Sequence, residues 1–176
     1  MALPISIKVT IILSVTFGII YFYLPFLFGA PYLSSNKRET STIVSFAKKY
    51  SKKKNPKALD LGSGNGRLIL ALSKSGIESH GFEINPILLG LTKLKIHLGK
   101  SKLKNKISVS QKNFMLEDLG KYDIITIFQN NRMMKKLEGK LQRELKKGSI
   151  VISNEWKFPN WKFIKQDGQI YLYRKE

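Results

Sequence analysis

A glycine-rich turn with the sequence DLGSGNG, at residues 60–66, lies between a short apolar run and a segment with helical spacing. Three glycines within five residues let the backbone approach a ligand closely, and the amides that begin the following helix can bind a polar or anionic group of that ligand. The next apolar run ends at Glu83, where a carboxylate can accept both hydroxyls of a ribose. These residue types, in this order, predict a site for a nucleotide-type ligand.

The spacing of the glycines bears on which ligand is bound. In the dinucleotide fingerprint G-x-G-x-x-G the third glycine comes one residue later than Gly66 does here, where Asp60 precedes a G-x-G-x-G pattern. A dinucleotide is therefore disfavoured, although Glu83 would suit either ligand class. A tight turn in an α/β domain without a ligand is the third alternative.

Alternating strand and helix patterns surround this turn. Helices are predicted over residues 40–50, 66–74, 86–99 and 133–145, and strands over KALDLG, SHGFEI, KISVSQ, YDIITIF and GSIVISNEW. Two alternating runs around Asp167-Gly168 predict a closing hairpin. The order of elements predicts an α/β domain with a mostly parallel sheet and a C-terminal antiparallel hairpin.

The N-terminal residues differ from the rest of the chain. Val9–Ala30 is a run of 22 residues without a charge, and a helix of that length would cross a hydrocarbon core of about 30 Å. One lysine precedes the run and many follow it, so the positive-inside rule places the following domain in the cytoplasm. We predict a single-pass membrane protein, with a transmembrane anchor and lead-in over residues 1–33 and one domain over residues 34–176. A cleaved signal peptide and a buried core helix are the alternatives.

The chain is strongly basic and has no cysteine. It carries 31 Lys and Arg against 12 Asp and Glu, a net charge of +19, and an anionic membrane surface is the partner that this charge predicts beside a membrane anchor. Nucleic acid is disfavoured because 26 of the basic residues are lysines, without a dense arginine cluster, although a general bias toward lysine would explain much of the charge. Without cysteine, neither a disulfide nor a thiolate metal site can form, and no metal site of another kind is predicted.

The turn resembles motif I of class I S-adenosylmethionine-dependent methyltransferases, in which an acidic residue precedes G-x-G-x-G. The resemblance implies a Rossmann-like fold and S-adenosylmethionine as the cofactor. It also implies that a polar residue after the third strand meets the adenine, and QKNFMLED offers Asn113 followed by Phe114 there. The predicted cofactor-binding residues are Asp60, Gly62, Ser63, Gly64, Gly66, Glu83, Asn113 and Phe114.

Longer stretches are similar to small protein-lysine methyltransferases, including archaeal lysine methyltransferases and the membrane-anchored ATP-synthase c-subunit lysine methyltransferases. These stretches are PYLSSNKRETSTIVSFAKK, LDLGSGNGRLIL, GFEINP, NFMLEDLGKYDIITIF and LEGKLQRELKKGSIVISNEWKFPNW. The family's proline after the lead-in is a serine here. An (Asn/Asp)-Pro-Pro motif, which adenine N6 methyltransferases carry after the fourth strand, is absent at residues 128–131.

Methylation of a lysine requires an acceptor site that attracts an ammonium group and then favours its neutral form. A carboxylate and an aromatic face are suited to the first step, and Glu155 with Trp156 follows the fifth strand. Phe128 and Trp156 could instead belong to the core, and Glu155 could pair with a surface lysine. The predicted acceptor-site residues are Glu155, Trp156, Phe128, Gln129, Asn130 and Tyr32.

The function predicted from these features is a membrane-anchored, S-adenosylmethionine-dependent protein-lysine N-methyltransferase whose partner is a protein with an accessible lysine. A phospholipid-headgroup N-methyltransferase is the main alternative. An RNA methyltransferase and a non-catalytic S-adenosylmethionine-binding membrane protein are further alternatives.

Overall fold

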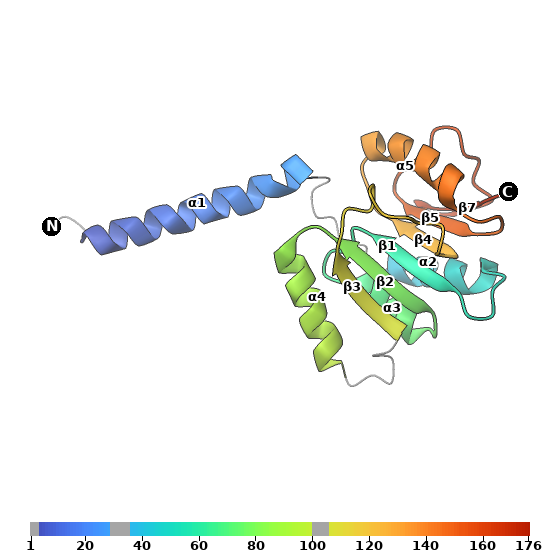
Figure 1. Ribbon diagram of the computed structural model, residues 1–176, viewed down its shortest axis with the longest axis horizontal. Coiled ribbons are helices and arrows are strands. Elements are labelled where there is room, and N and C mark those ends of the chain that lie inside the picture. The colour runs from blue at the N-terminus through green and yellow to red at the C-terminus, as the bar shows by residue number, and fades with distance from the viewer. Residues whose placement is uncertain (1–3, 29–35, 100–105) are drawn as a thin grey trace. The chain divides into compact units, whose positions relative to one another are not determined.

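The computed structural model describes residues 4–28, 36–99 and 106–176. The chain divides into two units, Met1–Leu33 and Ser34–Glu176. The first unit contains one helix, α1 (Ile5–Phe28), and the second contains a sheet with helices on both faces (Figure 1). Tyr32 and the rest of the predicted lead-in lie outside the described residues.

The sheet of the second unit has seven described strands in the order β3-β2-β1-β4-β5-β7-β6. The five strands from β3 to β5 are parallel to their neighbours, and β7 pairs antiparallel with both β5 and β6. This arrangement confirms the predicted mostly parallel sheet with a C-terminal antiparallel hairpin. The strands are β1 (Lys57–Leu61), β2 (Glu78–Glu83), β3 (Ile107–Gln111), β4 (Ile124–Ile127), β5 (Ile150–Asn154), β6 (Lys165–Asp167) and β7 (Ile170–Arg174).

The strand order reverses beside β1, which pairs with β2 on one side and β4 on the other. In open α/β sheets such a reversal leaves a crevice at the carboxyl ends of the strands, and ligands bind there. The glycine-rich turn follows β1 directly, because β1 ends at Leu61 and the turn begins at Gly62. The topology therefore brings the turn to the position where a ligand is expected.

Helices α2 (Lys37–Tyr50), α3 (Arg67–Lys74) and α4 (Pro86–Leu98) cover one face of the sheet, and α5 (Asn131–Glu144) covers the other (Figure 1). Ile43 of α2 and Leu72 of α3 pack in one cluster, and Leu137 of α5 packs in the cluster on the opposite face. The buried strands β1, β4 and β5 supply apolar side chains to both clusters. A strand covered on both faces has this composition because no side of it meets water.

Two helices begin earlier than predicted because side chains cap them. α2 begins at Lys37, since Asn36 and Glu39 form a capping box in which each side chain accepts the other's backbone N–H. α5 begins at Asn131, since the Asn130 side chain accepts the N–H of Met133 at 3.0 Å. The apolar periodicity marks only the part of each helix that packs against the sheet.

The predicted transmembrane helix is not confirmed. Over the residues that the structure describes, no helix is long and apolar enough to cross a membrane.

Candidate functional site

The glycine-rich turn has a backbone conformation that its glycines permit. Gly62, Gly64 and Gly66 have φ angles of +82°, +53° and +77°, in the left-handed region that other residues rarely adopt. The N–H groups of Gly62 and Ser63 both donate to the carbonyl of Phe82, at 2.9 and 3.0 Å. These two bonds hold the turn against the end of β2.

The third glycine serves helix packing. A Cβ atom at Gly66 would collide with the Thr92 side chain of α4, and the Thr92 hydroxyl donates to the Gly64 carbonyl at 3.0 Å. Thr92 is fully buried. Gly66 therefore permits α4 to lie against the turn, and the Thr92–Gly64 bond helps to hold the turn in place.

Glu83 is the centre of the hydrogen bonds in this turn. One carboxylate oxygen accepts the N–H of Gly64 at 2.7 Å, and the other accepts the N–H of Asn85 at 2.8 Å. The side chain is buried, and bonds from an N–H to a carboxylate are stronger than those between neutral groups. Each carboxylate oxygen can accept a further bond, so Glu83 keeps capacity for two ribose hydroxyls.

Asp60 lies beside Glu83 in a buried position on β1. The Thr126 hydroxyl of β4 donates to its carboxylate at 2.8 Å. Burial raises the pKa of Asp60 to about 7; the Thr126 hydrogen bond lowers it, and the charge of Glu83 raises it further. A cation bound nearby would favour the ionised form.

This set of groups fits S-adenosylmethionine. The cofactor carries a ribose with two hydroxyls, which Glu83 can accept, and positive charge, which the buried Asp60 carboxylate can stabilise. The Ser63 hydroxyl is buried and has no hydrogen-bond partner among the described residues. A Cβ at Gly62 would lie 2.8 Å from Nε2 of Gln129, so the space over this glycine is already limited.

The two residues predicted to meet the adenine follow β3. The Asn113 side chain is exposed, and its oxygen accepts the N–H of Met115 at 3.0 Å, which closes a short turn. Phe114 is half-buried and packs against the core cluster that includes Phe82. The contact of Asn113 and Phe114 with adenine stays a prediction.

After β4, the three predicted acceptor-site residues have different surroundings. Gln129 donates from Nε2 to the Leu61 carbonyl at 3.3 Å and lies next to Gly62, so the residues after β4 contact the glycine turn. Asn130 caps α5, a structural role that its position after a strand did not predict. Phe128 is half-buried at the end of the strand.

After β5, the backbone turns sharply at Glu155. Its φ is +71°, it is the one non-glycine residue in the described chain with a positive φ, and its side chain is exposed. The Glu155 N–H donates to the Gln169 carbonyl of the hairpin at 2.8 Å. Trp156 is half-buried against the core on the α5 face, in agreement with the alternative that it serves packing. The roles proposed for Glu155 and Trp156 toward an acceptor stay predictions.

Two contacts at this edge of the sheet were not predicted. Thr126 supports Asp60 from the neighbouring strand, and a threonine inside the apolar run IITI was the available signal, because a buried hydroxyl requires a partner. The Asn154 amide, which is 2% exposed at the end of β5, donates to the Glu39 carboxylate of α2 at 3.0 Å. That bond holds the start of α2 next to Glu155. The only feature of the sequence that pointed to a role for Glu39 was the capping pattern that it forms with Asn36.

Comparison with known proteins agrees with the geometry. The chain is 28% identical over 146 residues to the adenine nucleotide translocase lysine N-methyltransferase of Mus musculus, covering 82% of this chain and 61% of that protein. It is 31% identical over 136 residues to the ATP synthase c-subunit lysine N-methyltransferase of Rattus norvegicus, covering 74% and 58%. The chain thus spans about three fifths of the length of these two relatives. It is 30% identical over 124 residues to a protein-lysine N-methyltransferase of Saccharolobus islandicus, covering 65% of this chain and 76% of that protein.

The fold also has solved counterparts. The crystal structure of an RNA methyltransferase from Salinibacter ruber, in complex with S-adenosyl-L-homocysteine, matches with a TM-score of 0.69 at 20% identity, over 81% of this chain and 92% of that one. This likeness confirms the predicted Rossmann-like methyltransferase fold.

A family profile matches the same region. The family described as "ANTKMT methyltransferase domain" matches residues 60–165, from Asp60 before the glycine turn to the first residue of β6. The match confirms the resemblance to methyltransferases that use S-adenosylmethionine. With most of its length matched, the chain belongs to the ANTKMT methyltransferase domain family.

Proposed function

We propose that this protein is an S-adenosylmethionine-dependent protein-lysine N-methyltransferase. The observation that carries the proposal is the pair of buried carboxylates at the switch point of the sheet: Glu83 accepts the N–H of Gly64 in the glycine turn, and Asp60 accepts the hydroxyl of Thr126 on β4. The relatives support lysine as the acceptor, since the three described above are lysine N-methyltransferases by name.

The cofactor side of the site would bind S-adenosylmethionine and orient it. When bound, S-adenosylmethionine supplies an activated methyl group. Glu83 would hold the ribose, because its carboxylate is fixed by two backbone N–H groups and keeps free lone pairs. Asp60 would stabilise positive charge, and the bond from Thr126 keeps its carboxylate in place.

The acceptor side attracts the lysine and helps it to lose a proton. The exposed Glu155 carboxylate would bind the incoming ammonium, and Trp156 would offer an aromatic face to it. Removal of water from the ammonium lowers the pKa of lysine and so favours the neutral amine that attacks the methyl group. The enzyme's task is then mainly to position the two reacting atoms.

The acceptor protein that we propose is associated with a membrane. Two relatives are named for adenine nucleotide translocase and for the c subunit of ATP synthase. In this chain the uncharged run Val9–Ala30 and the exposed apolar side chains along the described part of α1, including Ile12 and Phe17, support membrane attachment through the first unit. The positive charge after this run supports a cytoplasmic second unit.

The function is tested by incubating the full chain with methyl-labelled S-adenosylmethionine and isolated membranes, followed by separation of protein from lipid. We expect label on a protein, mapped to a lysine by mass spectrometry. A Glu83→Gln variant should transfer no label, and Glu78→Gln, which lies on the same strand but on its partly exposed side, should transfer it normally. Label confined to lipid would establish the headgroup enzyme in its place, and nuclease-sensitive label would establish an RNA methyltransferase.

Membrane attachment is tested separately, by alkaline extraction of membranes that contain the full chain or a chain lacking residues 1–30. We expect the full chain to remain in the membrane fraction and the shortened chain to be released. Release of the full chain would contradict the proposed anchor without affecting the proposed methyl transfer.

A further inference from the structure

Helix α4 presents an apolar stripe to solvent. Its members are Ile87, Leu91, Leu94 and Leu98, with exposed fractions of 42%, 47%, 52% and 68%. Their spacing of four, three and four residues places them within an arc of about 60°, since each residue turns an α-helix by about 100°. We name these four residues the α4 stripe.

The fold does not use the α4 stripe. The opposite side of α4 packs on the sheet, where Leu89 forms a buried cluster with Ile69 and Val109, and Ile96 packs against it. Thr92 on that side bonds to the glycine turn. Burial of the inner side accounts for the position of the helix, so the stripe requires another explanation.

Charge around the stripe is of one sign. α4 has no acidic residue, and both of its lysines, Lys93 and Lys95, are exposed. At about 100° per residue, Lys95 lies about 40° beyond one edge of the stripe, whereas Lys93 lies about 100° beyond the other edge. An apolar stripe flanked by lysines is the arrangement by which helices lie in the surface of an anionic bilayer.

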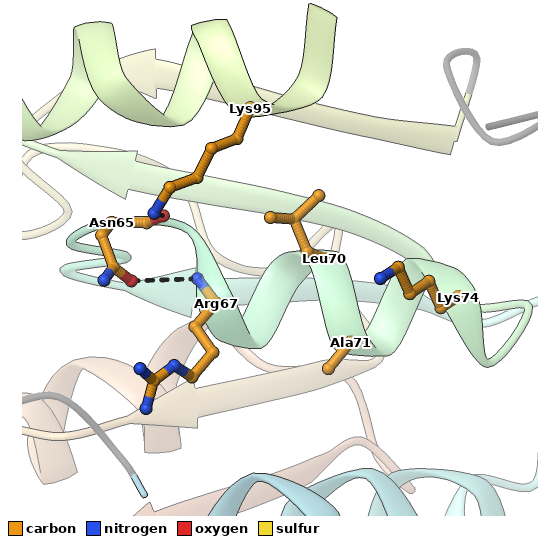
Figure 2. Close-up of a pocket in the computed structure, with 6 residues that line it drawn as sticks. All are labelled: Asn65, Arg67, Leu70, Ala71, Lys74 and Lys95. Carbon is orange, nitrogen blue, oxygen red and sulfur yellow. Dashed lines mark hydrogen bonds between the residues drawn. The ribbon is translucent and has the colours of Figure 1, made fainter. Parts of the chain in front are cut away.

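A basic groove adjoins one flank of the stripe. The groove, of about 350 Å³, lies between α3 and α4 (Figure 2). Lys95 lines it and donates from Nζ to the Asn65 carbonyl at 3.0 Å. The lining contains no acidic residue, and its members are Asn65, Arg67, Leu70, Ala71, Lys74 and Lys95. Its positive charge suits a phosphate group.

We propose that the α4 stripe and the adjoining groove form a docking surface for an anionic lipid bilayer. The stripe would enter the boundary between headgroups and acyl chains, while the groove and the flanking lysines would bind lipid phosphates. A second copy of the chain fits the stripe less well, because it would bring Lys93 and Lys95 of two chains, each with a net charge of +19, close together. This surface belongs to the second unit, and the proposal requires neither α1 nor methyl transfer.

The absence of cysteine from the chain allows a test on the full-length protein. A Leu94→Cys variant carries a polarity-sensitive fluorophore on the α4 stripe, and a Lys136→Cys variant carries it at an exposed position of α5 on the other face of the sheet. Both are mixed with vesicles of phosphatidylcholine, with or without phosphatidylglycerol. We expect a blue shift for the label at residue 94, larger on the vesicles with phosphatidylglycerol, and none for the label at residue 136.

The two label positions separate α4 from α1, since attachment through α1 would be common to both variants. Equal shifts at the two positions, or none at residue 94, would overturn the proposal. A shift at residue 94 that grows with protein concentration without vesicles would overturn it in favour of a second copy. A shift that is the same on neutral and anionic vesicles would overturn the assignment to anionic lipid.

The contribution of the groove is measured by adding Lys74→Glu to the labelled Leu94→Cys protein. Lys74 is exposed, so the substitution leaves the core unchanged. Reversal of one charge near the membrane surface should shift the equilibrium between docked and undocked α4 by about tenfold or more, and so reduce the blue shift of the label at residue 94 on vesicles with phosphatidylglycerol. An unchanged blue shift would remove the groove from the docking surface.

Discussion

The carboxyl ends of β1 and β2 differ from those of β4 and β5, although all four meet at one edge of the sheet. At the first pair, Glu83 and Asp60 are buried and hydrogen-bonded to the turn and to a neighbouring strand. At the second pair, Gln129 is half-buried and Glu155 is exposed on a backbone in the left-handed region. The ends of β1 and β2, where we propose that the cofactor binds, are held by hydrogen bonds, whereas Glu155 at the end of β5, where we propose that the acceptor lysine binds, is open to solvent.

This difference agrees with what each side would bind. A cofactor is the same in every turnover, so fixed donors and acceptors can be arranged for it in advance. A lysine on a protein arrives with its own surroundings, and part of the acceptor surface then comes from the substrate. We therefore expect substitutions on the cofactor side to have larger effects on cofactor binding, and substitutions on the acceptor side to have smaller effects that appear mainly in turnover.

The largest effect is expected for Glu83→Gln. The amide of glutamine keeps one accepting oxygen, but its NH2 group would face the backbone N–H of Gly64 or of Asn85. One of the two hydrogen bonds is then lost, and two N–H donors face each other in its place. The dissociation constant for S-adenosylmethionine should rise about 100-fold in calorimetry. The matched control is Glu78→Gln at the start of the same strand. If Glu83→Gln binds the cofactor as tightly as this control does, the cofactor does not bind at Glu83.

The pH dependence of cofactor binding should follow Asp60. Its pKa of about 7 in the free protein means that the carboxyl is mostly neutral below pH 7, and a bound cation favours the ionised form. Cofactor affinity should therefore rise with pH up to about 7, by at most about tenfold per pH unit, and then level off. In Asp60→Asn this dependence should disappear. A flat profile for the unsubstituted protein between pH 5.5 and 8 would show that Asp60 does not respond to the cofactor.

Gly62→Ala should have a moderate effect that Gly148→Ala does not share. Both glycines have a φ near +85°, but a Cβ at Gly148 meets open space, whereas one at Gly62 would displace Gln129. Each substitution should lower the free energy of unfolding by about 1–2 kcal/mol because of the backbone. Only Gly62→Ala should also weaken cofactor binding several-fold. Equal cofactor affinities in the two variants would mean that the position of Gln129 is unimportant to the cofactor side.

The smallest effects are expected at Glu155, where strain and charge can be separated. Glu155→Gly relieves the left-handed conformation and should stabilise the protein by about 1 kcal/mol, whereas Glu155→Ala retains the strain. Both variants lack the carboxylate, so both should lower the turnover of a protein substrate while leaving cofactor affinity unchanged. Turnover equal to that of the parent protein in both variants would show that the Glu155 carboxylate takes no part in methyl transfer.

The residues that we propose for the cofactor side could be chosen from the sequence because their signals are local. An acidic residue, three closely spaced glycines and a carboxylate after the next strand are read directly from the chain. The hydrogen-bond partners of these residues were harder to predict from the sequence. The Thr126–Asp60 bond joins residues 66 apart in the chain and depends on the pairing of β1 with β4. On the acceptor side, Asn130 is an amide after a strand by sequence, yet it caps α5. The same residue type serves either purpose, and only the position of the next helix decides between them.

The amino-acid sequence by itself determined the order of strands and helices, the glycine turn and the hairpin, because each depends on residues close together in the chain. Tertiary structure decided what depends on distant residues, such as the bond of Glu39 to Asn154. It also decided which side of α4 faces solvent. Apolar residues occur on both sides of that helix, so the sequence pattern does not show which side is buried. Packing against β2 and β3 places Leu89 in the core and leaves Leu94 on the surface.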